Sequence, residues 1–282
     1  MSTNPSLRQP MGPLSIGNVV SAALVLYRSH LKTYLRLALF AYLWILVPIY
    51  GWAKYFAISG LIARLAFGEL ISKPESVTTA RSYTNSRRWS FFRIAFQVGL
   101  MLFGIYLGLF IPTYFIIVIV GLGAIFISNS VFGNPLVGAV IFAIVAIVGI
   151  LAFLFGLIWF VSRWIVAEVP LAVEENTNGA QSINRSWELT KNSVRHIQGI
   201  VLVAFLVSLP IVAVTSYIPQ IFLLQIEQGS TLYWIVYLIS FITSSVGGIF
   251  ILPFWQAIKA VVYYDLRSRR EGLGLQIRDS MS

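Results

Sequence analysis

The segment 94–162 contains 69 consecutive residues without an Asp, Glu, Lys or Arg, and no other feature of the sequence constrains the fold as strongly. A helix crosses a hydrocarbon core of about 30 Å with roughly 20 apolar residues, so this segment is long enough for at least two crossings. The segments 37–53, 197–226 and 228–258 are also free of charged side chains. Because these segments are apolar throughout rather than alternating in polarity, they predict transmembrane helices and not the strands of a β-barrel.

The composition agrees with a membrane protein, since 58% of the residues are hydrophobic and 11% are charged. Soluble domains carry about a quarter charged residues. We predict an all-α polytopic bundle in a single transmembrane domain, 15–272, between polar tails at 1–14 and 273–282. The expected spans are 31–50, 52–71, 93–117, 136–160, 198–218 and 233–256. The chain has no cysteine, which excludes disulfides, thiolate metal sites and lipid attachment through a thiol.

The basic residues predict the orientation. Nineteen of the 20 Lys and Arg residues fall in four groups: before the first expected span or on its first turns, between the second and third spans or on their ends, after the fourth span, and after the sixth. Lys54 is the exception. Because cytoplasmic loops are enriched in Lys and Arg, this distribution predicts that both termini are cytoplasmic. Residues 31–71 could also form one kinked helix, giving five spans. Two crossings joined by a turn at 48–51 are favoured, because they keep the basic segment 64–93 inside.

An amphipathic segment precedes the first, third and fifth expected spans. In the first segment, Ile16, Val19, Val20, Ala23 and Tyr27 fall on one helical face. Two interpretations remain open: three repeated units (15–71, 75–160 and 180–257), each an interfacial elbow helix followed by a hairpin, or the basic amphipathic loops that many membrane proteins share.

Two motifs carry a resemblance to a known family. They are RSWELTK at 185–191, which follows Glu174, and YYDLRSRREG at 263–272. With the segment 14–31 they resemble the glycerophosphoryl diester phosphodiesterase membrane-domain family and its multi-span bacterial relatives. The resemblance implies the membrane fold, in a bacterial plasma membrane or an internal (thylakoid) membrane. It does not imply the phosphodiesterase activity, since that enzyme's soluble barrel of roughly 250 residues has no counterpart in this sequence.

The charged residues near the expected inner ends of the spans are the candidate site. Arg163, Glu168 and Arg185 are predicted to form an ion network, beneath a span 4 helix that continues to about residue 172. Asp265 and Arg269 have the i,i+4 spacing of a helical ion pair. Each of these groups has either a structural role or a role in a polar vestibule for a lipid headgroup or small solute. The full set of candidate headgroup contacts is Arg163, Glu168, Glu174, Arg185, Asp265, Arg267, Arg269 and Arg270.

The sequence predicts a non-enzymatic protein with no catalytic, cofactor or metal site. No protease, hydrolase or phosphate-loop motif is present, and His30 and His196 lie at the expected ends of elbows rather than within a span. The favoured function is an accessory or membrane-organising factor that contacts anionic lipids or a membrane protein partner, and not nucleic acid. The alternative is a carrier of a lipidic or amphiphilic molecule.

Overall fold

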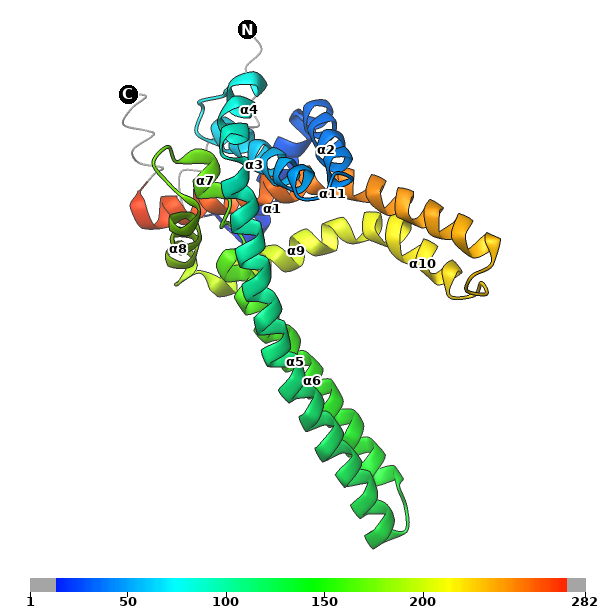
Figure 1. The fold of residues 1–282 in the computed structure, drawn as a ribbon. Helices are drawn as coiled ribbons and strands as arrows, with labels where there is room; N and C mark the ends of the chain where they lie inside the picture. Colours follow the sequence, from blue (N-terminus) through cyan, green and yellow to red (C-terminus); the bar gives the residue numbers. More distant parts are fainter. Residues whose placement is uncertain (1–13, 273–282) are drawn as a thin grey trace. The chain divides into compact units, whose positions relative to one another are not determined.

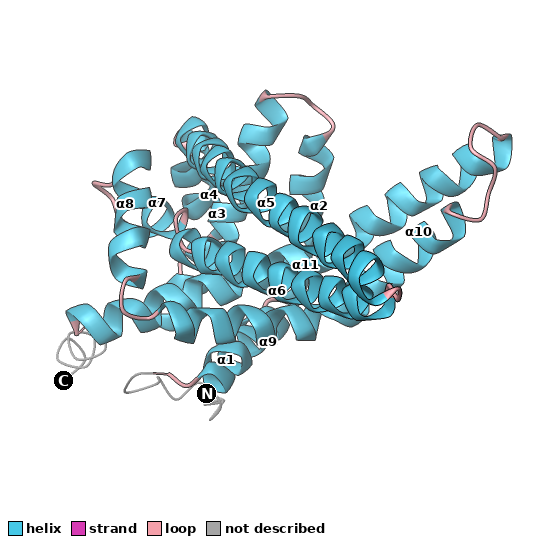
Figure 2. Cartoon of the chain, turned by 90° about the horizontal axis from the view of Figure 1, so that it is seen from below, coloured by secondary structure: helices cyan, strands magenta, loops and turns pink. Residues whose placement is uncertain are grey.

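The computed structural model describes residues 14–272, and every regular element among them is a helix (Figures 1 and 2). Apart from Leu14, both predicted polar tails lie outside the described residues. The chain divides into two compact units. Unit 1 comprises Met1–Ala95 and Ile165–Ser282, and unit 2 comprises Phe96–Trp164.

Four helical segments are long and apolar enough to cross a membrane, and they contain the spans predicted at 93–117, 136–160, 198–218 and 233–256. The first is α5 (Arg88–Phe132), and the second is Leu136–Val173, which contains α6 (Leu136–Trp164) and the short α7 (Val169–Val173). The third contains α9 (Val194–Val212), the π-helix η1 (Ala213–Tyr217) and α10 (Ile218–Leu223). The fourth is α11 (Thr231–Glu271).

Two predicted boundaries need correction. The loop expected after residue 117 is helical as far as Phe132, because residues 118–127 are apolar and no proline between 118 and 132 ends the helix. Span 4 was expected to remain helical to about residue 172. Instead α6 ends at Trp164, and α7 begins after a turn with Pro170 in its first turn, where proline is best tolerated.

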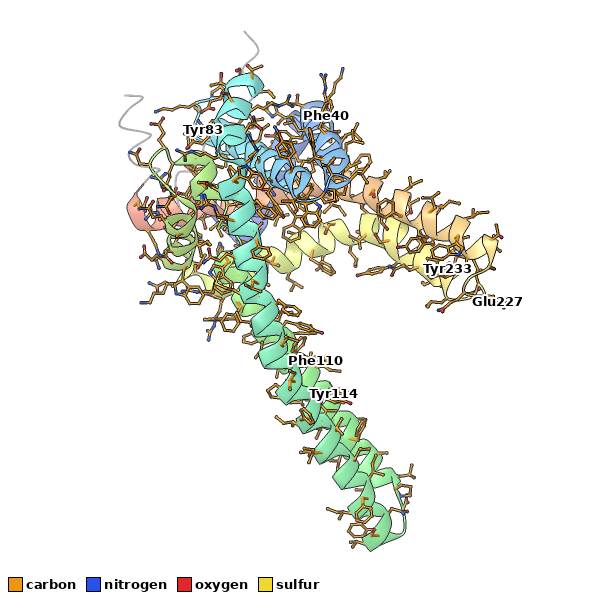
Figure 3. All side chains as sticks on the ribbon, viewed as in Figure 1. Phe40, Tyr83, Phe110, Tyr114, Glu227 and Tyr233 are labelled. Atoms are coloured by element: carbon orange, nitrogen blue, oxygen red, sulfur yellow. The ribbon has the colours of Figure 1, made fainter. Side chains whose placement is uncertain are left out.

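Unit 2 is a close-packed helical hairpin. A Cβ on Gly138 would lie 2.4 Å from the Cα of Ile125 on the opposite helix, so a small residue is needed there. Tyr106, Phe110 and Tyr114 stack along α5 with ring centroids 5.5 and 6.1 Å apart. Figure 3 labels Phe110 and Tyr114. Phe110 and Tyr114 remain exposed, as expected for side chains that face lipid.

Unit 1 is built around the C-terminal half of α11. Its residues from Pro253 to Leu266 are largely buried, and α11 packs against α1 (Ile16–Ser29), α2 (Leu31–Ile45), α3 (Tyr50–Leu70) and α9. The N-terminal half of α11 instead pairs with η1 and α10 in an apolar hairpin, and Glu227 and Tyr233 lie at its tip (Figure 3). Unit 1 thus combines a packed helical head with one lipid-type hairpin.

Short helices occur at all three predicted elbow positions: α1, α4 (Val77–Ser86) and α8 (Gly179–Thr190). The apolar face of α1 is nevertheless covered by protein rather than left for the membrane interface. Val19, Val20 and Ala23 are buried, and α1 packs against α9 and α11. The repeated interfacial elbow units are therefore not confirmed.

Six spans are not confirmed either. The turn predicted near Pro48 is present, and Ile49, the residue that precedes α3, has a φ of 60°. However, the 15 residues of α2 rise about 22 Å, less than a hydrocarbon core of about 30 Å. Most of α3 is buried within the head, from Ala57 to Gly68 in particular.

Candidate functional site

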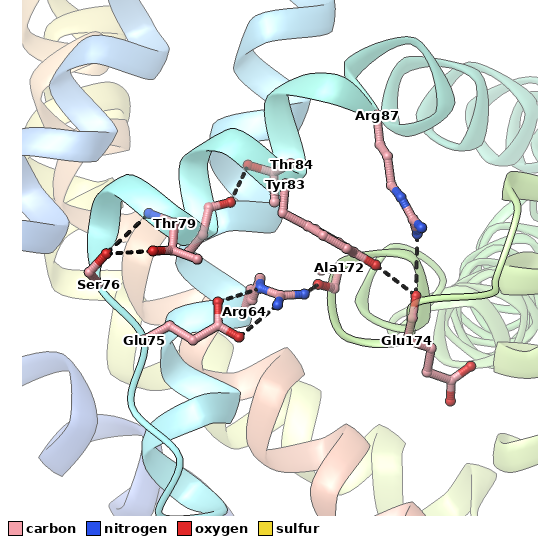
Figure 4. Close-up of polar contacts among 10 residues, drawn as sticks. Arg64, Glu75, Ser76, Thr79, Tyr83, Thr84, Arg87, Ala172 and Glu174 are labelled. Carbon is pink, nitrogen blue, oxygen red and sulfur yellow. Dashed lines mark hydrogen bonds and ion pairs between the residues drawn. The ribbon is translucent and has the colours of Figure 1, made fainter.

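The segment between α7 and α8 is fastened to α4 through the carbonyl oxygen of Glu174. The Tyr83 hydroxyl donates to this oxygen at 2.8 Å and the Arg87 guanidinium at 3.2 Å (Figure 4). The guanidinium carbons of Arg64 and Arg87 lie 4.0 and 4.4 Å from the centroid of the Tyr83 ring. Burial raises the pKa of the Tyr83 hydroxyl, so this group remains a protonated donor at neutral pH.

Arg64 makes contacts inside unit 1 and joins α3 to two other segments of the chain. Its guanidinium donates to both carboxylate oxygens of Glu75, at 2.9 and 2.6 Å, and to the carbonyl of Ala172 at 2.7 Å (Figure 4). The Arg64 side chain is only 13% exposed. A planar guanidinium can make all these bonds at once, whereas a lysine ammonium would lose the two-pronged contact.

The ion pairs in the structure differ from the predicted network of Arg163, Glu168 and Arg185. Glu168 bonds Lys259 at 2.6 Å, whereas Arg185 pairs with Glu271 and lies 3.7 Å from the Glu174 carboxylate. Arg267 pairs with Glu271 at 2.8 Å, and the Tyr263 hydroxyl donates to the Glu174 carboxylate. In unit 2, the buried Arg163 lies 5.7 Å from the Trp159 ring centroid.

The predicted Asp265–Arg269 ion pair is confirmed, at 2.8 Å. The Asp265 carboxylate also accepts the backbone N–H of Leu14 at 2.7 Å, and Arg269 donates to the Leu14 carbonyl at 2.6 Å. His196 lies 3.5 Å from the same carboxylate, which is 1% exposed. This cluster fastens residue 14 to α11. Of the eight candidates, Arg269 and Arg270 are exposed at the end of α11. The ion pairs and hydrogen bonds given above involve Glu168, Glu174, Arg185, Asp265, Arg267 and Arg269.

Acidic side chains do not converge on a metal site in the described part of the chain. No group of three or more His, Cys, Asp or Glu residues there has the proximity needed to hold an ion. The carboxylates of Glu168, Glu174, Asp265 and Glu271 instead face the basic or hydroxyl partners described above.

Sequence reasoning missed a groove in unit 1 that α2, α3 and α4 line. It consists of two cavities of about 410 and 210 Å³, which share Phe40 and Arg81 in their walls. The larger cavity is lined by Lys32, Thr33, Arg36, Leu37, Phe40, Val77 and Arg81, and the smaller by Phe40, Trp44, Lys54, Ala57, Ile58, Leu61, Arg81, Thr84 and Asn85. We call this feature the α2–α4 groove.

The α2–α4 groove has four cationic side chains and no acidic one in its lining. Lys54 bonds the Asn85 side chain and lies 5.8 and 5.6 Å from the ring centroids of Trp44 and Tyr50. Lys32, Arg36 and Arg81 are exposed, and the structure gives them no ion pair with any acidic residue that it describes. A signal was present in the sequence, because positions 32, 36 and 40 lie on one helical face.

Comparison with family models, curated proteins and solved structures found no match to this chain. The α2–α4 groove is therefore interpreted from its own geometry.

Proposed function

We propose that the chain is a non-enzymatic, multi-pass membrane protein, an accessory or membrane-organising factor that contacts anionic lipids. The observation that carries this proposal is the α2–α4 groove, where exposed cations lie beside apolar side chains without acidic partners. Cations close to an anionic leaflet contribute roughly 1 kcal/mol each to membrane attraction. A basic groove on a helical membrane protein is well suited to lipid headgroups.

The proposed topology has both termini in the cytoplasm. Four crossings, by α5, α6, the α9–α10 segment and α11, return the chain to its starting side. The same side then carries the basic residues of α1 to α4, α8 and the end of α11, in agreement with the enrichment of Lys and Arg in cytoplasmic loops. We place the protein in a bacterial plasma or thylakoid membrane on the strength of the family resemblance alone.

Lipid mass spectrometry of the full chain, purified from native membranes in mild detergent, tests this proposal. We expect the retained lipids to be enriched in anionic species relative to the membrane from which they came. Retained lipids that match the bulk composition would overturn the proposal.

The same preparation tests the carrier alternative. After reconstitution into vesicles with fluorescently labelled phospholipid, the chain should not accelerate lipid movement between leaflets. Acceleration over protein-free vesicles would replace the accessory role with transport. A protein that co-purifies in stoichiometric amount would identify the partner on which an accessory factor acts.

A further inference from the structure

We propose that the α2–α4 groove is a binding site for one anionic diacyl phospholipid. In this arrangement Arg36, Arg81 and Lys32 bind the phosphate, and the groove beyond Phe40 takes the upper part of an acyl chain. The inference rests on the proposed function, because it presupposes contact with anionic lipids. It goes further in assigning one lipid to one place, with a polar end and an apolar end.

The groove has the length and polarity that such a ligand needs. From Lys32 to Trp44 the axis of α2 rises about 18 Å, so the site extends well beyond a single phosphate group. Its larger cavity holds three of the cations together with the Thr33 hydroxyl. Its smaller cavity is lined by five apolar side chains, among them the buried Ala57, Ile58 and Leu61, and by Lys54, Arg81, Thr84 and Asn85.

The cations of the larger cavity are available to a phosphate. Arg36 lies over the Phe40 ring at 5.9 Å, a contact that orients its guanidinium without neutralising it. Arg81 faces the same cavity from α4, so the two guanidinium groups reach the ligand from different helices. Guanidinium groups bind phosphate oxygens through paired hydrogen bonds, which gives a geometric preference that a diffuse positive surface lacks.

The surface beside the groove favours a lipid over a soluble phosphate or an acidic peptide. On α2 the side chains of Leu39, Phe40 and Leu43 are 46%, 41% and 53% exposed, and Leu46 at the following turn is 68% exposed. Trp52 on the first turn of α3 is also exposed, in the manner of aromatic residues at membrane interfaces. A soluble anion would leave this apolar surface in water, whereas a phospholipid in a bilayer covers it.

The test compares two double variants of the full chain that lose the same charge. Arg36→Gln with Arg81→Gln removes two groove cations, and Lys191→Gln with Arg195→Gln removes two exposed cations that do not line the groove. Native mass spectrometry in mild detergent measures binding of phosphatidylglycerol, with phosphatidylcholine as the neutral reference. We expect the wild type to bind one phosphatidylglycerol in preference to phosphatidylcholine. Its affinity for phosphatidylglycerol should fall about tenfold to thirtyfold in the groove variant. In the Lys191→Gln, Arg195→Gln variant the same affinity should change by less than about threefold.

The outcomes separate the two proposals. If both variants lose affinity for phosphatidylglycerol equally, the groove site is overturned, whereas the proposed general attraction to anionic lipids still stands. A wild type without preference for phosphatidylglycerol would overturn the proposed function itself.

A second experiment leaves Arg36 and Arg81 unchanged. The chain has no cysteine, so Thr33→Cys in the groove and Ser82→Cys, exposed outside it, each provide a single thiol. In detergent, phosphatidylglycerol should slow maleimide labelling at position 33 and leave the rate at position 82 unchanged. An unchanged rate at position 33 at saturating lipid would overturn the groove site.

Discussion

At the residue scale, Tyr83 connects more parts of the head than its position in a short polar helix suggests. Its hydroxyl fastens the Glu174 carbonyl, and its ring contacts two guanidinium groups. These contacts join α3, α4 and the α7–α8 segment. The ring and the hydroxyl should therefore make separable contributions to the stability of unit 1.

Tyr83→Phe should lower the free energy of unfolding by about 1 kcal/mol, since it removes one hydrogen bond and retains the ring. Tyr83→Leu should lower it by about 2 to 3 kcal/mol, because both cation–π contacts are lost as well. Thermal unfolding of the purified chain in mild detergent should rank the three proteins in that order. Tyr114→Phe removes a hydroxyl from an exposed residue and should change the free energy by less than about 0.5 kcal/mol.

If the Leu and Phe variants melt together, the two arginine contacts contribute nothing and Tyr83 acts through its hydroxyl alone. If the Tyr83→Phe variant unfolds at the same temperature as the wild type, the hydrogen bond to Glu174 does not contribute to stability.

Local spacing explains which contacts could be predicted. Asp265 and Arg269 were correctly paired because four residues separate them on one helix. Arg64 bonds Glu75 across the turn between α3 and α4, and Ala172 from more than 100 residues away. Such partners depend on how helices pack, and a charge pattern along one sequence does not encode it.

At the element scale, α3 and the start of α5 approach closely through Gly60. A Cβ at this position would lie 2.4 Å from the Cε1 atom of Phe91, a ring that is 1% exposed. Phe91 is thus held directly against the backbone of α3, and any side chain at position 60 must displace it.

Gly60→Ala should therefore destabilise the chain by about 1 to 3 kcal/mol, despite the better helix propensity of alanine. Gly17→Ala on α1 is the matched control, because no atom lies within 4 Å of its added Cβ. That variant should be neutral or up to about 1 kcal/mol more stable. Thermal unfolding in the same detergent measures both.

Adding Phe91→Leu to Gly60→Ala should recover part of the loss, since the smaller side chain makes room for the methyl group. A Gly60→Ala variant as stable as the wild type would show that Phe91 can move at little cost, contrary to its tight packing.

The helices themselves were largely predictable, and their partners were not. Long charge-free segments predicted α5, α6, α9 and α11, because membrane helices are defined by length and polarity. The environment of α1 and α3 was misjudged, since an apolar helical face looks the same in sequence whether protein or lipid covers it. The α2–α4 groove was missed for a different reason, because its cations come from three separate helices whose packing the sequence does not show.

At the scale of the whole molecule, the α2–α3 pair decides how the chain meets the membrane. In the proposed topology, two crossings would place the turn between α2 and α3 outside, whereas a pair that belongs to the head would keep that turn on the cytoplasmic side. The shortness of α2, the burial of α3 and the charge-bearing contacts of Arg64 favour the second arrangement. Both arrangements leave the segment 72–87 and the C-terminus on the same side, so only the turn distinguishes them.

Single cysteines in the cysteine-free chain distinguish the two arrangements with a membrane-impermeant maleimide. Gln228→Cys, beyond α10, should react in intact cells, and Ser82→Cys on α4 should react only after the membrane is opened. Val47→Cys, at the exposed turn before α3, should behave like position 82 if the head lies wholly on the cytoplasmic side. Labelling of position 47 in intact cells would instead establish six crossings. It would also place the α2–α4 groove within the membrane thickness. Because an unpaired charge there is costly, the cations of the groove would need a lipid phosphate or another anion even more than they do at the cytoplasmic side.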